Sequence, residues 1–277
     1  MPDVKGIIAL DLDGTLLDCD KNLSETNFAA LKRAAESGYA IVPTTGRFYD
    51  GMPENIRTLP FVRYAITING AEVKDLATGR VLYQAELPYL QAAEIMSLLD
   101  RYPMIYDCYM DGAGWMTEGF KALIDQTVDS PHYRKMLHEL RRPVPELKAF
   151  LRERKQDVQK LQFFTRDEAL RLRLLHQLPE MFGEICVSSS APQNVEVNQK
   201  NANKGQALMA LAEHLGLPKE HTISFGDGLN DISMLREAGV GIAMKNACPE
   251  ALEAADWVTA SNDEDGVALG IEKFCFH

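Results

Sequence analysis

The feature that most constrains this chain is an apolar run, residues 6–10, that leads directly into two aspartates, Asp11 and Asp13, and a glycine. A short apolar run without polar interruption is typical of a strand buried on both faces of a parallel sheet. Because residues i and i+2 of an extended chain point to the same side, both carboxylates can face one site at the end of this strand. Carboxylates that close repel each other unless a cation or a shared proton offsets their charge. Asp and Gly also favour turns, so the interpretation depends on the rest of the chain.

Strand and helix signals alternate through the first 80 or so residues. Ser24 is a candidate N-cap for a helix that ends at Gly38. Strands are predicted over residues 39–44 and 63–68, and each runs into small or polar residues: Thr45-Gly46-Arg47 after the first, Asn69-Gly70 after the second. This alternation predicts a parallel sheet with helices on both faces, and such sheets bind ligands at the carboxyl ends of their strands.

From about residue 83 the pattern changes to short strands paired by hairpins, with helices between them. The predicted strands cover residues 104–110, 115–117, 158–165, 183–188 and 194–197. Residues 111–114 (Asp-Gly-Ala-Gly) are consistent with a hairpin turn or with a loop that reaches a substrate. The charged stretch 131–155 is interpreted as a solvated helix face. We expect residues 83–191 to form a second, α+β domain inserted into the first.

After residue 198 the first pattern returns. A helix that begins at Lys204 precedes predicted strands over residues 222–225, 240–244 and 257–260. The first of these strands runs into Gly226-Asp227-Gly228-Leu229-Asn230-Asp231. The predicted fold class is therefore α/β, with a Rossmann-like parallel sheet built from residues 1–82 and 192–277 and interrupted by the α+β insert.

Composition excludes several classes of partner. The formal net charge of the 277-residue chain is −11, which argues against nucleic acid and requires local positive charge to hold an anionic substrate. The chain has no apolar run long enough to cross a bilayer, so neither a membrane partner nor a secretory signal is expected. The five cysteines lack CxxC spacing and the histidines lack paired spacing, which favours a reducing cytoplasm and argues against a zinc site.

Polar side chains gather at the predicted carboxyl edge of the sheet: Asp11 with Asp13, Thr45, Lys204, and Asp227 with Asn230 and Asp231. Converging carboxylates are destabilising without a counter-charge, and a hard divalent cation is the usual solution. With oxygen ligands only, that cation is expected to be Mg²⁺. Lys204 and Thr45 offer an ammonium and a hydroxyl to an anion with several oxygens. This set suits phosphoryl transfer, in which positioning and charge neutralisation supply most of the catalysis.

The chain resembles the haloacid dehalogenase (HAD) superfamily, and the insert resembles the α/β cap of its Cof-type subclass IIB phosphatases. The resemblance rests on four motifs in order: Asp11-Leu12-Asp13-Gly14-Thr15, Thr45-Gly46-Arg47, Asn203-Lys204-Gly205, and Gly226-Asp227-Gly228-Leu229-Asn230-Asp231. It covers essentially the whole chain, because the two core segments and the insert match in order and size.

The resemblance implies catalytic and metal-binding roles for the aspartates. Asp11 would be the nucleophile that forms an aspartyl phosphate. Asp13 would protonate the leaving oxygen and then activate the hydrolytic water. Mg²⁺ would be held by the Asp11 carboxylate, the backbone carbonyl of Asp13 and Asp227. Asp231 would orient Lys204 or a metal-bound water.

The resemblance also implies a set of groups that bind the substrate. Thr45, the Gly46 amide and Lys204 would bind the phosphoryl oxygens, with Asn230 beside them. Arg47 fits the family pattern as well, and it is equally consistent with an exposed arginine at a helix start and with a substrate contact.

The function expected from this resemblance is a Mg²⁺-dependent phosphatase of small phosphomonoesters, sugar phosphates or related metabolites. A hexose phosphomutase is an alternative, although that branch has a differently spaced fourth motif. A non-catalytic phosphate-binding protein is a second alternative, which the intact Asp11 and Asp13 argue against. The sequence indicates neither the physiological substrate nor the oligomeric state. Nor does it show whether Asn69 contacts a substrate or only forms the turn before Gly70.

Overall fold

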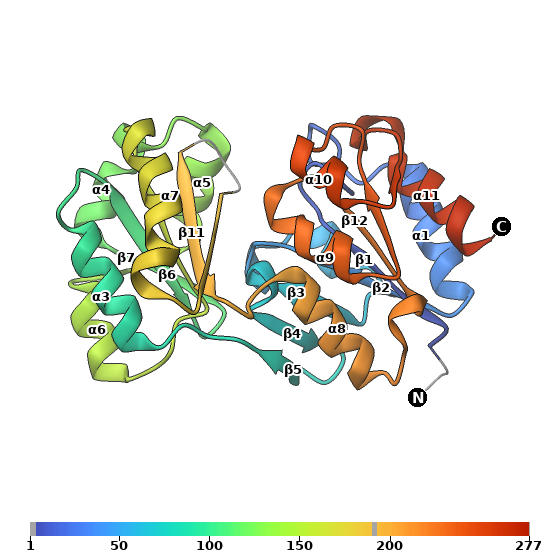
Figure 1. Ribbon diagram of the computed structural model, residues 1–277, viewed down its shortest axis with the longest axis horizontal. Helices are drawn as coiled ribbons and strands as arrows, with labels where there is room; N and C mark the ends of the chain where they lie inside the picture. Colours follow the sequence, from blue (N-terminus) through green and yellow to red (C-terminus); the bar gives the residue numbers. More distant parts are fainter. Residues whose placement is uncertain (1–3, 190–192, 277) are drawn as a thin grey trace. The chain divides into compact units, whose positions relative to one another are not determined.

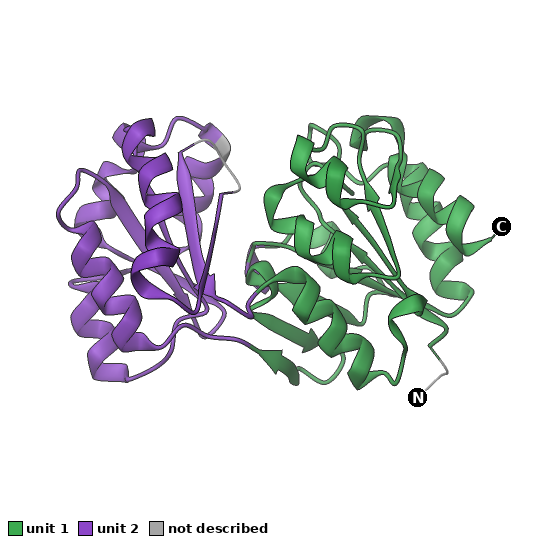
Figure 2. Cartoon of the chain, in the orientation of Figure 1, with its two compact units in different colours: residues 1–47, 52–84, 203–277 green, residues 48–51, 85–202 purple. Residues whose placement is uncertain are grey.

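The computed structural model describes residues 4–189 and 193–276, and it divides into two compact units (Figures 1 and 2). Unit 1 comprises residues 1–47, 52–84 and 203–277, and unit 2 comprises residues 48–51 and 85–202. Whereas the sequence suggested boundaries after residues 82 and 191, the units divide after residues 84 and 202. The later boundary follows from strand pairing, because β11 (Asn194–Gln199) lies between β9 (Lys160–Phe164) and β10 (Ile185–Ser188) of unit 2.

The main sheet of unit 1 is parallel throughout. Its strand order is β14-β13-β12-β1-β2, and the strands are β1 (Gly6–Leu10), β2 (Tyr39–Pro43), β12 (Thr222–Gly226), β13 (Val240–Ala243) and β14 (Trp257–Val258). All five residues of β1 are buried, as its apolar sequence predicts. Leu10 pairs with Phe225 on one side and Pro43 on the other, so β1, β12 and β2 end together. The predicted α/β fold class is confirmed.

Helices cover both faces of this sheet, as predicted. Ile7, Ala9 and Val42 pack against helices α8 (Lys204–His214) and α9 (Ile232–Glu237), while α1 (Glu25–Glu36) contacts α11 (Gly266–Cys275) (Figure 1). Ser24 is the N-cap of α1, and its side chain accepts a hydrogen bond from the Asn27 amide. The helices of unit 1 are α1 (Glu25–Glu36), α2 (Glu54–Arg57), α8 (Lys204–His214), α9 (Ile232–Glu237), α10 (Pro249–Ala254) and α11 (Gly266–Cys275). Short 3₁₀ turns span Tyr49–Gly51, Ile68–Gly70, Lys219–His221, Leu229–Asp231 and Asn262–Glu264.

The predicted third strand of the core sheet is arranged differently. β3 (Tyr64–Thr67) forms only isolated bridges to the β2 region, and its regular partner is β4 (Glu72–Asp75), which in turn pairs with β5 (Val81–Gln84). These three strands form an antiparallel sheet. The cause is local, because Ile68, Asn69 and Gly70 all have positive φ and reverse the chain at once, leaving no room for a crossover helix.

Unit 2 is built on a six-stranded sheet. Its order is β10-β11-β9-β6-β7-β8, and all pairs are antiparallel except β7–β8. The remaining strands are β6 (Ile105–Met110), β7 (Ala113–Thr117), β8 (Arg141–Val144), β9 (Lys160–Phe164) and β10 (Ile185–Ser188). The helices are α3 (Tyr89–Leu99), α4 (Glu118–Thr127), α5 (Pro131–Leu140), α6 (Leu147–Arg154) and α7 (Glu168–Phe182).

The two faces of the unit 2 sheet differ in chemistry. On one face Cys108, Phe163 and Val195 pack in an apolar core with α3, α6 and α7. On the other, Ile105 and Phe164 belong to a smaller apolar cluster with α4 and α5. Strand alternation therefore places a second set of side chains, from β6, β9 and β11, on that second face.

One prediction inside unit 2 was only partly right. The stretch 131–155 was expected to be a solvated helix face, but it contains α5, the strand β8 and α6. Arg142 and Arg154 are exposed as expected, whereas Arg141, the first residue of the edge strand β8, is buried because its side chain pairs with Asp107 of β6. Asp111 and Gly112 form a two-residue hairpin turn between β6 and β7, with positive φ at both positions.

Within residues 4–189 and 193–276, none of the helices combines the length and the apolar character that a bilayer crossing needs.

Candidate active site

Asp11 and Lys204 form a buried ion pair at the carboxyl end of β1. The Asp11 amide donates to the Phe225 carbonyl (3.0 Å), which places Asp11 beside the end of β12. Lys204 is the first residue of α8, whose N-cap Asn203 accepts from the Gln206 amide. Its Nζ donates to Asp11 Oδ1 at 2.6 Å, and the Lys204 side chain is fully buried. The motifs that contain Asp11 and Lys204, 193 residues apart, are thus in direct contact.

Asp231 organises the loop that follows β12. Lys204 Nζ also donates to Asp231 Oδ1 (2.6 Å), while Asp231 Oδ2 accepts from the amides of Asp227 and Gly228, each at 2.9 Å. A Cβ at Gly226 would lie 2.4 Å from the Asp231 Cβ, so only glycine lets this carboxylate turn back on its own loop. Both oxygens of Asp231 are therefore engaged in holding Lys204 and the loop.

The site collects more negative than positive charge. Ligand atoms of Asp11, Asp227 and Asp231 all lie within 4.8 Å of one another, with the single ammonium of Lys204 between two of them. Burial, reinforced by the charge of Asp231, raises the pKa of Asp227 to about 6. Burial and the same repulsion outweigh Lys204 and raise the pKa of Asp11. An all-oxygen site with uncompensated negative charge fits a hard divalent cation such as Mg²⁺.

The Asp13 carboxylate does not join this cluster. Arg47 holds it through two hydrogen bonds, from Nε to Oδ2 (2.9 Å) and from Nη2 to Oδ1 (2.8 Å), and Lys21 Nζ lies 3.1 Å from Oδ1. Burial disfavours the charged form of Asp13, but Arg47 and Lys21 together lower its pKa. Arg47, a predicted substrate ligand, thus binds Asp13, and the assignment of Asp13 to Mg²⁺ rests on its backbone carbonyl.

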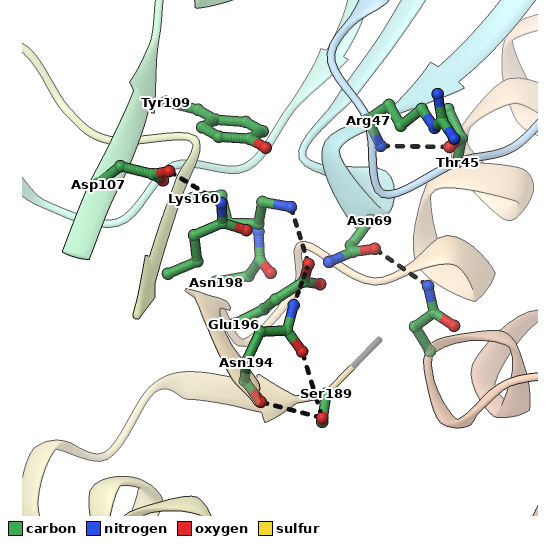
Figure 3. Close-up of polar contacts among 12 residues, drawn as sticks. Thr45, Arg47, Asn69, Asp107, Tyr109, Lys160, Ser189, Asn194, Glu196 and Asn198 are labelled. Atoms are coloured by element: carbon green, nitrogen blue, oxygen red, sulfur yellow. Dashed lines mark hydrogen bonds and ion pairs between the residues drawn. The ribbon is translucent and has the colours of Figure 1, made fainter. Parts of the chain in front are cut away.

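Thr45, Gly46 and Asn230 are linked through Asn69, which Figure 3 shows together with Thr45 and Arg47. The Asn69 amide donates to the Thr45 carbonyl (3.0 Å), and Asn69 Oδ1 accepts from Asn230 Nδ2 (3.2 Å). Thr45 Oγ1 accepts from the Arg47 amide at 3.2 Å. A Cβ at Gly46 would lie 2.6 Å from Asn69 Oδ1, so glycine is required for this close approach. Asn69 tolerates the left-handed backbone (φ 57°) that puts it there.

Two residues of the site had no predicted role. Thr15 Oγ1 donates to Asp227 Oδ1 at 2.7 Å and fixes the orientation of that carboxylate. The position of Thr15 at the end of the first motif is the sequence signal that could have identified it as a site residue. Lys21 reaches Asp13 from a loop where its own φ is positive (66°), and nothing in the sequence pattern pointed to it.

Three comparisons with known proteins show what the chain as a whole is similar to. Residues 8–271 match the family model of haloacid dehalogenase-like hydrolases. The phosphatase YwpJ of Bacillus subtilis (strain 168) is 31% identical over 286 residues, covering 95% of this chain and 97% of YwpJ. The 5-amino-6-(5-phospho-D-ribitylamino)uracil phosphatase YcsE of the same organism is 31% identical over 270 residues, covering 97% of this chain and 95% of YcsE. A solved structure of a haloacid dehalogenase-like hydrolase from B. subtilis has a TM-score of 0.83 at 29% identity, covering 97% of this chain and 99% of that one.

Proposed function

Because this chain belongs to the haloacid dehalogenase-like hydrolases, as a phosphatase of their Cof-type subclass IIB that acts on small phosphomonoesters, we propose that it dephosphorylates sugar phosphates or related metabolites through an aspartyl-phosphate intermediate. The observation that carries the proposal is the Asp11 carboxylate, which Lys204 holds at 2.6 Å beside two further carboxylates. A binding protein would not need a nucleophile fixed in this way.

In the first half of the reaction, a carboxylate oxygen of Asp11 attacks phosphorus, and the bond from phosphorus to the ester oxygen breaks. Asp13 gives its proton to that oxygen as it leaves. In the second half, Asp13 takes a proton from water, whose oxygen attacks phosphorus and releases phosphate, restoring the Asp11 carboxylate. Because Arg47 stabilises ionised Asp13, this ion pair has to open before Asp13 can carry a proton.

The remaining residues position the phosphoryl group. We assign its oxygens to the Lys204 ammonium, the Thr45 hydroxyl, the Gly46 amide and the Asn230 side chain, all of them hydrogen-bond donors. Mg²⁺ held by Asp11, Asp227 and the Asp13 carbonyl would neutralise charge on those oxygens. Asp231 fixes Lys204 and the Asp227 amide, so it acts by positioning.

We assign recognition of the rest of the substrate to unit 2. The core residues assigned to the phosphoryl oxygens would bind only a group that every phosphomonoester shares, so discrimination among substrates requires other side chains. One relative, YcsE, is named for a substrate whose phosphate is attached to a ribityl chain, which supports a hydroxyl-bearing metabolite as the substrate of this chain too.

A cytoplasmic location remains a prediction from the cysteine pattern.

Phosphate release from a panel of phosphorylated sugars, pyridoxal phosphate and p-nitrophenyl phosphate tests the proposal. Release that needs Mg²⁺, stops in excess EDTA and is lost in Asp11→Asn is expected. Trapping of labelled phosphate on the wild-type protein, absent in Asp11→Asn, would establish the covalent intermediate. Conversion of a hexose phosphate into its isomer without phosphate release would instead favour a phosphomutase.

A further inference from the structure

The loop between β13 and α10, residues 244–248, is hydrogen-bonded to the loop that carries Asp227. The Met244 amide donates to the Gly226 carbonyl (3.0 Å), and the Cys248 amide donates to the Asp227 carbonyl (2.9 Å). Both hydrogen bonds join backbone groups, so they fix the position of this loop independently of its side chains. We call residues 244–248 the brace loop, because its first and last residues are both held at the end of β12.

One side chain of the brace loop reaches the other aspartate loop of the site, which follows β1. Asn246 Nδ2 donates to the Gly14 carbonyl at 2.8 Å, although the two residues are 232 positions apart in the sequence. Asn246 Oδ1 accepts from the Asn262 amide (3.1 Å), and Asn262 Nδ2 donates to the Leu17 carbonyl (2.9 Å). Two asparagines, from the segments after β13 and β14, therefore hold the loop after β1 at two of its carbonyl groups.

Gly14 is the position at which the loop after β1 most needs an external partner. Its φ is 93°, and a Cβ there would lie 2.5 Å from Asp227 Oδ2, so glycine is required. Glycine also leaves the backbone on both sides free to rotate. Asn246 fixes the peptide group that follows Gly14. The peptide group before Gly14 carries the Asp13 carbonyl, our proposed Mg²⁺ ligand, and the next residue, Thr15, orients Asp227.

A loop that is held in place binds a metal ion more tightly than a loop that is free to move. Ordering the backbone of a residue costs conformational entropy, and a ligand that has to order its site on binding loses that free energy. The Asn246 side chain is exposed, so its replacement creates no cavity and the fold should tolerate the change. Its effect on metal binding can therefore be measured on folded protein.

We propose that Asn246 and Asn262 are positioning residues for the metal, which hold the Asp13 carbonyl and Thr15 in the arrangement that Mg²⁺ binding requires before the ion arrives. This inference rests on the proposed function, since a Mg²⁺ site between the loops after β1 and β12 is part of it. Neither asparagine is assigned a contact with the ion or the substrate. Their replacement should therefore weaken Mg²⁺ binding and leave kcat at saturating Mg²⁺ nearly unchanged.

The first test measures Mg²⁺ binding without substrate, from the rise in melting temperature as MgCl₂ is added. The variant is Asn246→Leu, because leucine is uncharged and similar in shape but forms neither hydrogen bond. We expect its Mg²⁺ dissociation constant to be about tenfold that of wild type, with kcat for p-nitrophenyl phosphate at saturating Mg²⁺ within about threefold. Lys245→Met is the control, since it removes only an exposed ion pair with Glu264 from the same loop and should leave the dissociation constant within about twofold.

The outcomes of this test separate the inference from the proposed function. A dissociation constant that is unchanged in Asn246→Leu, or raised equally in Lys245→Met, would overturn the inference and leave the proposed Mg²⁺ site intact. A loss of kcat with unchanged Mg²⁺ binding would also overturn it, because Asn246 would then act on the reaction and not on the metal. If Mg²⁺ does not raise the melting temperature of wild type, the proposed metal site fails and the inference fails with it.

The second test follows the loop itself by amide hydrogen exchange in the absence of Mg²⁺. Within the loop after β1, the Leu17 amide donates to the Leu12 carbonyl (2.9 Å), so local opening of the loop exposes this amide to exchange. We expect exchange in a peptide covering residues 12–18 to be about tenfold faster in Asn246→Leu, since losing a hydrogen bond shifts the opening equilibrium by about that factor. Exchange in β12 should not change. Equal exchange of residues 12–18 in both proteins, or faster exchange in β12 as well, would overturn the positioning role.

Discussion

The guanidinium group of Arg47 binds both carboxylate oxygens of Asp13, through Nε at 2.9 Å and Nη2 at 2.8 Å. Such paired hydrogen bonds between charged groups are stronger and more directional than single ones. The two residues come from the first and second motifs, so the contact ties the loop after β1 to the loop after β2. It also favours the ionised form of Asp13, the proposed acid–base residue, whose carboxylate is not part of the cluster of Asp11, Asp227 and Asp231.

Replacement of Arg47 by glutamine is expected to lower the melting temperature at pH 7 by about 2 °C, corresponding to about 1 kcal/mol for a partly exposed ion pair. The folded-state pKa of Asp13 is lowered, so this stabilisation is present above the unfolded-state pKa and is lost as pH falls through the folded-state value. The difference in melting temperature between wild type and Arg47→Gln should therefore shrink between pH 5 and about pH 3. A difference that does not vary with pH would show that Asp13 is not its source.

Asp11→Asn is expected to lower kcat by about a thousandfold or more, because an amide cannot attack phosphorus. The fold should persist, since the raised pKa of Asp11 shows that its charge is unfavourable in the folded state and Lys204 keeps Asp231 as a partner. Melting curves and steady-state kinetics measure the two effects. The exposed Asp20→Asn is the control, with activity expected within twofold of wild type. Retention of a tenth of the activity in Asp11→Asn would contradict the covalent mechanism.

Mg²⁺ binding is expected to depend on pH through Asp227. Burial and Asp231 raise its folded-state pKa to about 6, so without metal the stability that its protonation contributes is present in acid and is lost as pH rises through about 6. Mg²⁺ binds the deprotonated carboxylate. The rise in melting temperature on adding millimolar Mg²⁺ should thus be larger at pH 7.5 than at pH 5. The same rise at both values, or a rise unaltered in Asp227→Asn, would remove Asp227 from the metal site.

Thr15→Val is expected to raise the Mg²⁺ concentration needed for half-maximal activity by about tenfold, the usual effect of removing a group that orients a metal ligand. Thr15 Oγ1 donates to Asp227 Oδ1 at 2.7 Å, and valine has a similar shape without the hydroxyl. Thr15→Ser keeps the hydroxyl and should restore the wild-type requirement. Metal titrations of phosphate release give both values. Equal requirements in the valine and serine variants would show that this hydrogen bond does not orient Asp227.

The parallel core and the center of the candidate site followed from the sequence because both depend on local signals. The apolar run of β1 predicts a buried strand, and Asp11 directly follows it. Lys204 is the first residue of a helix whose N-cap is Asn203, and Asp227 directly follows β12. Carboxyl ends of neighbouring parallel strands meet at one edge of a sheet, so these residues converge whatever the length of chain between them.

Tertiary structure alone decided which charged groups pair. Sequence patterns place a side chain on a face or at an edge, but Arg47 was equally consistent with a substrate contact, and Arg141 was assigned to a solvated surface. Whether an arginine reaches Asp13 or Asp107 depends on distances of a few ångströms between segments at least 34 residues apart. Those distances are set by strand register and by small residues such as Gly114 that leave room for a long side chain, and electrostatic attraction then acts only between the groups that packing has brought together.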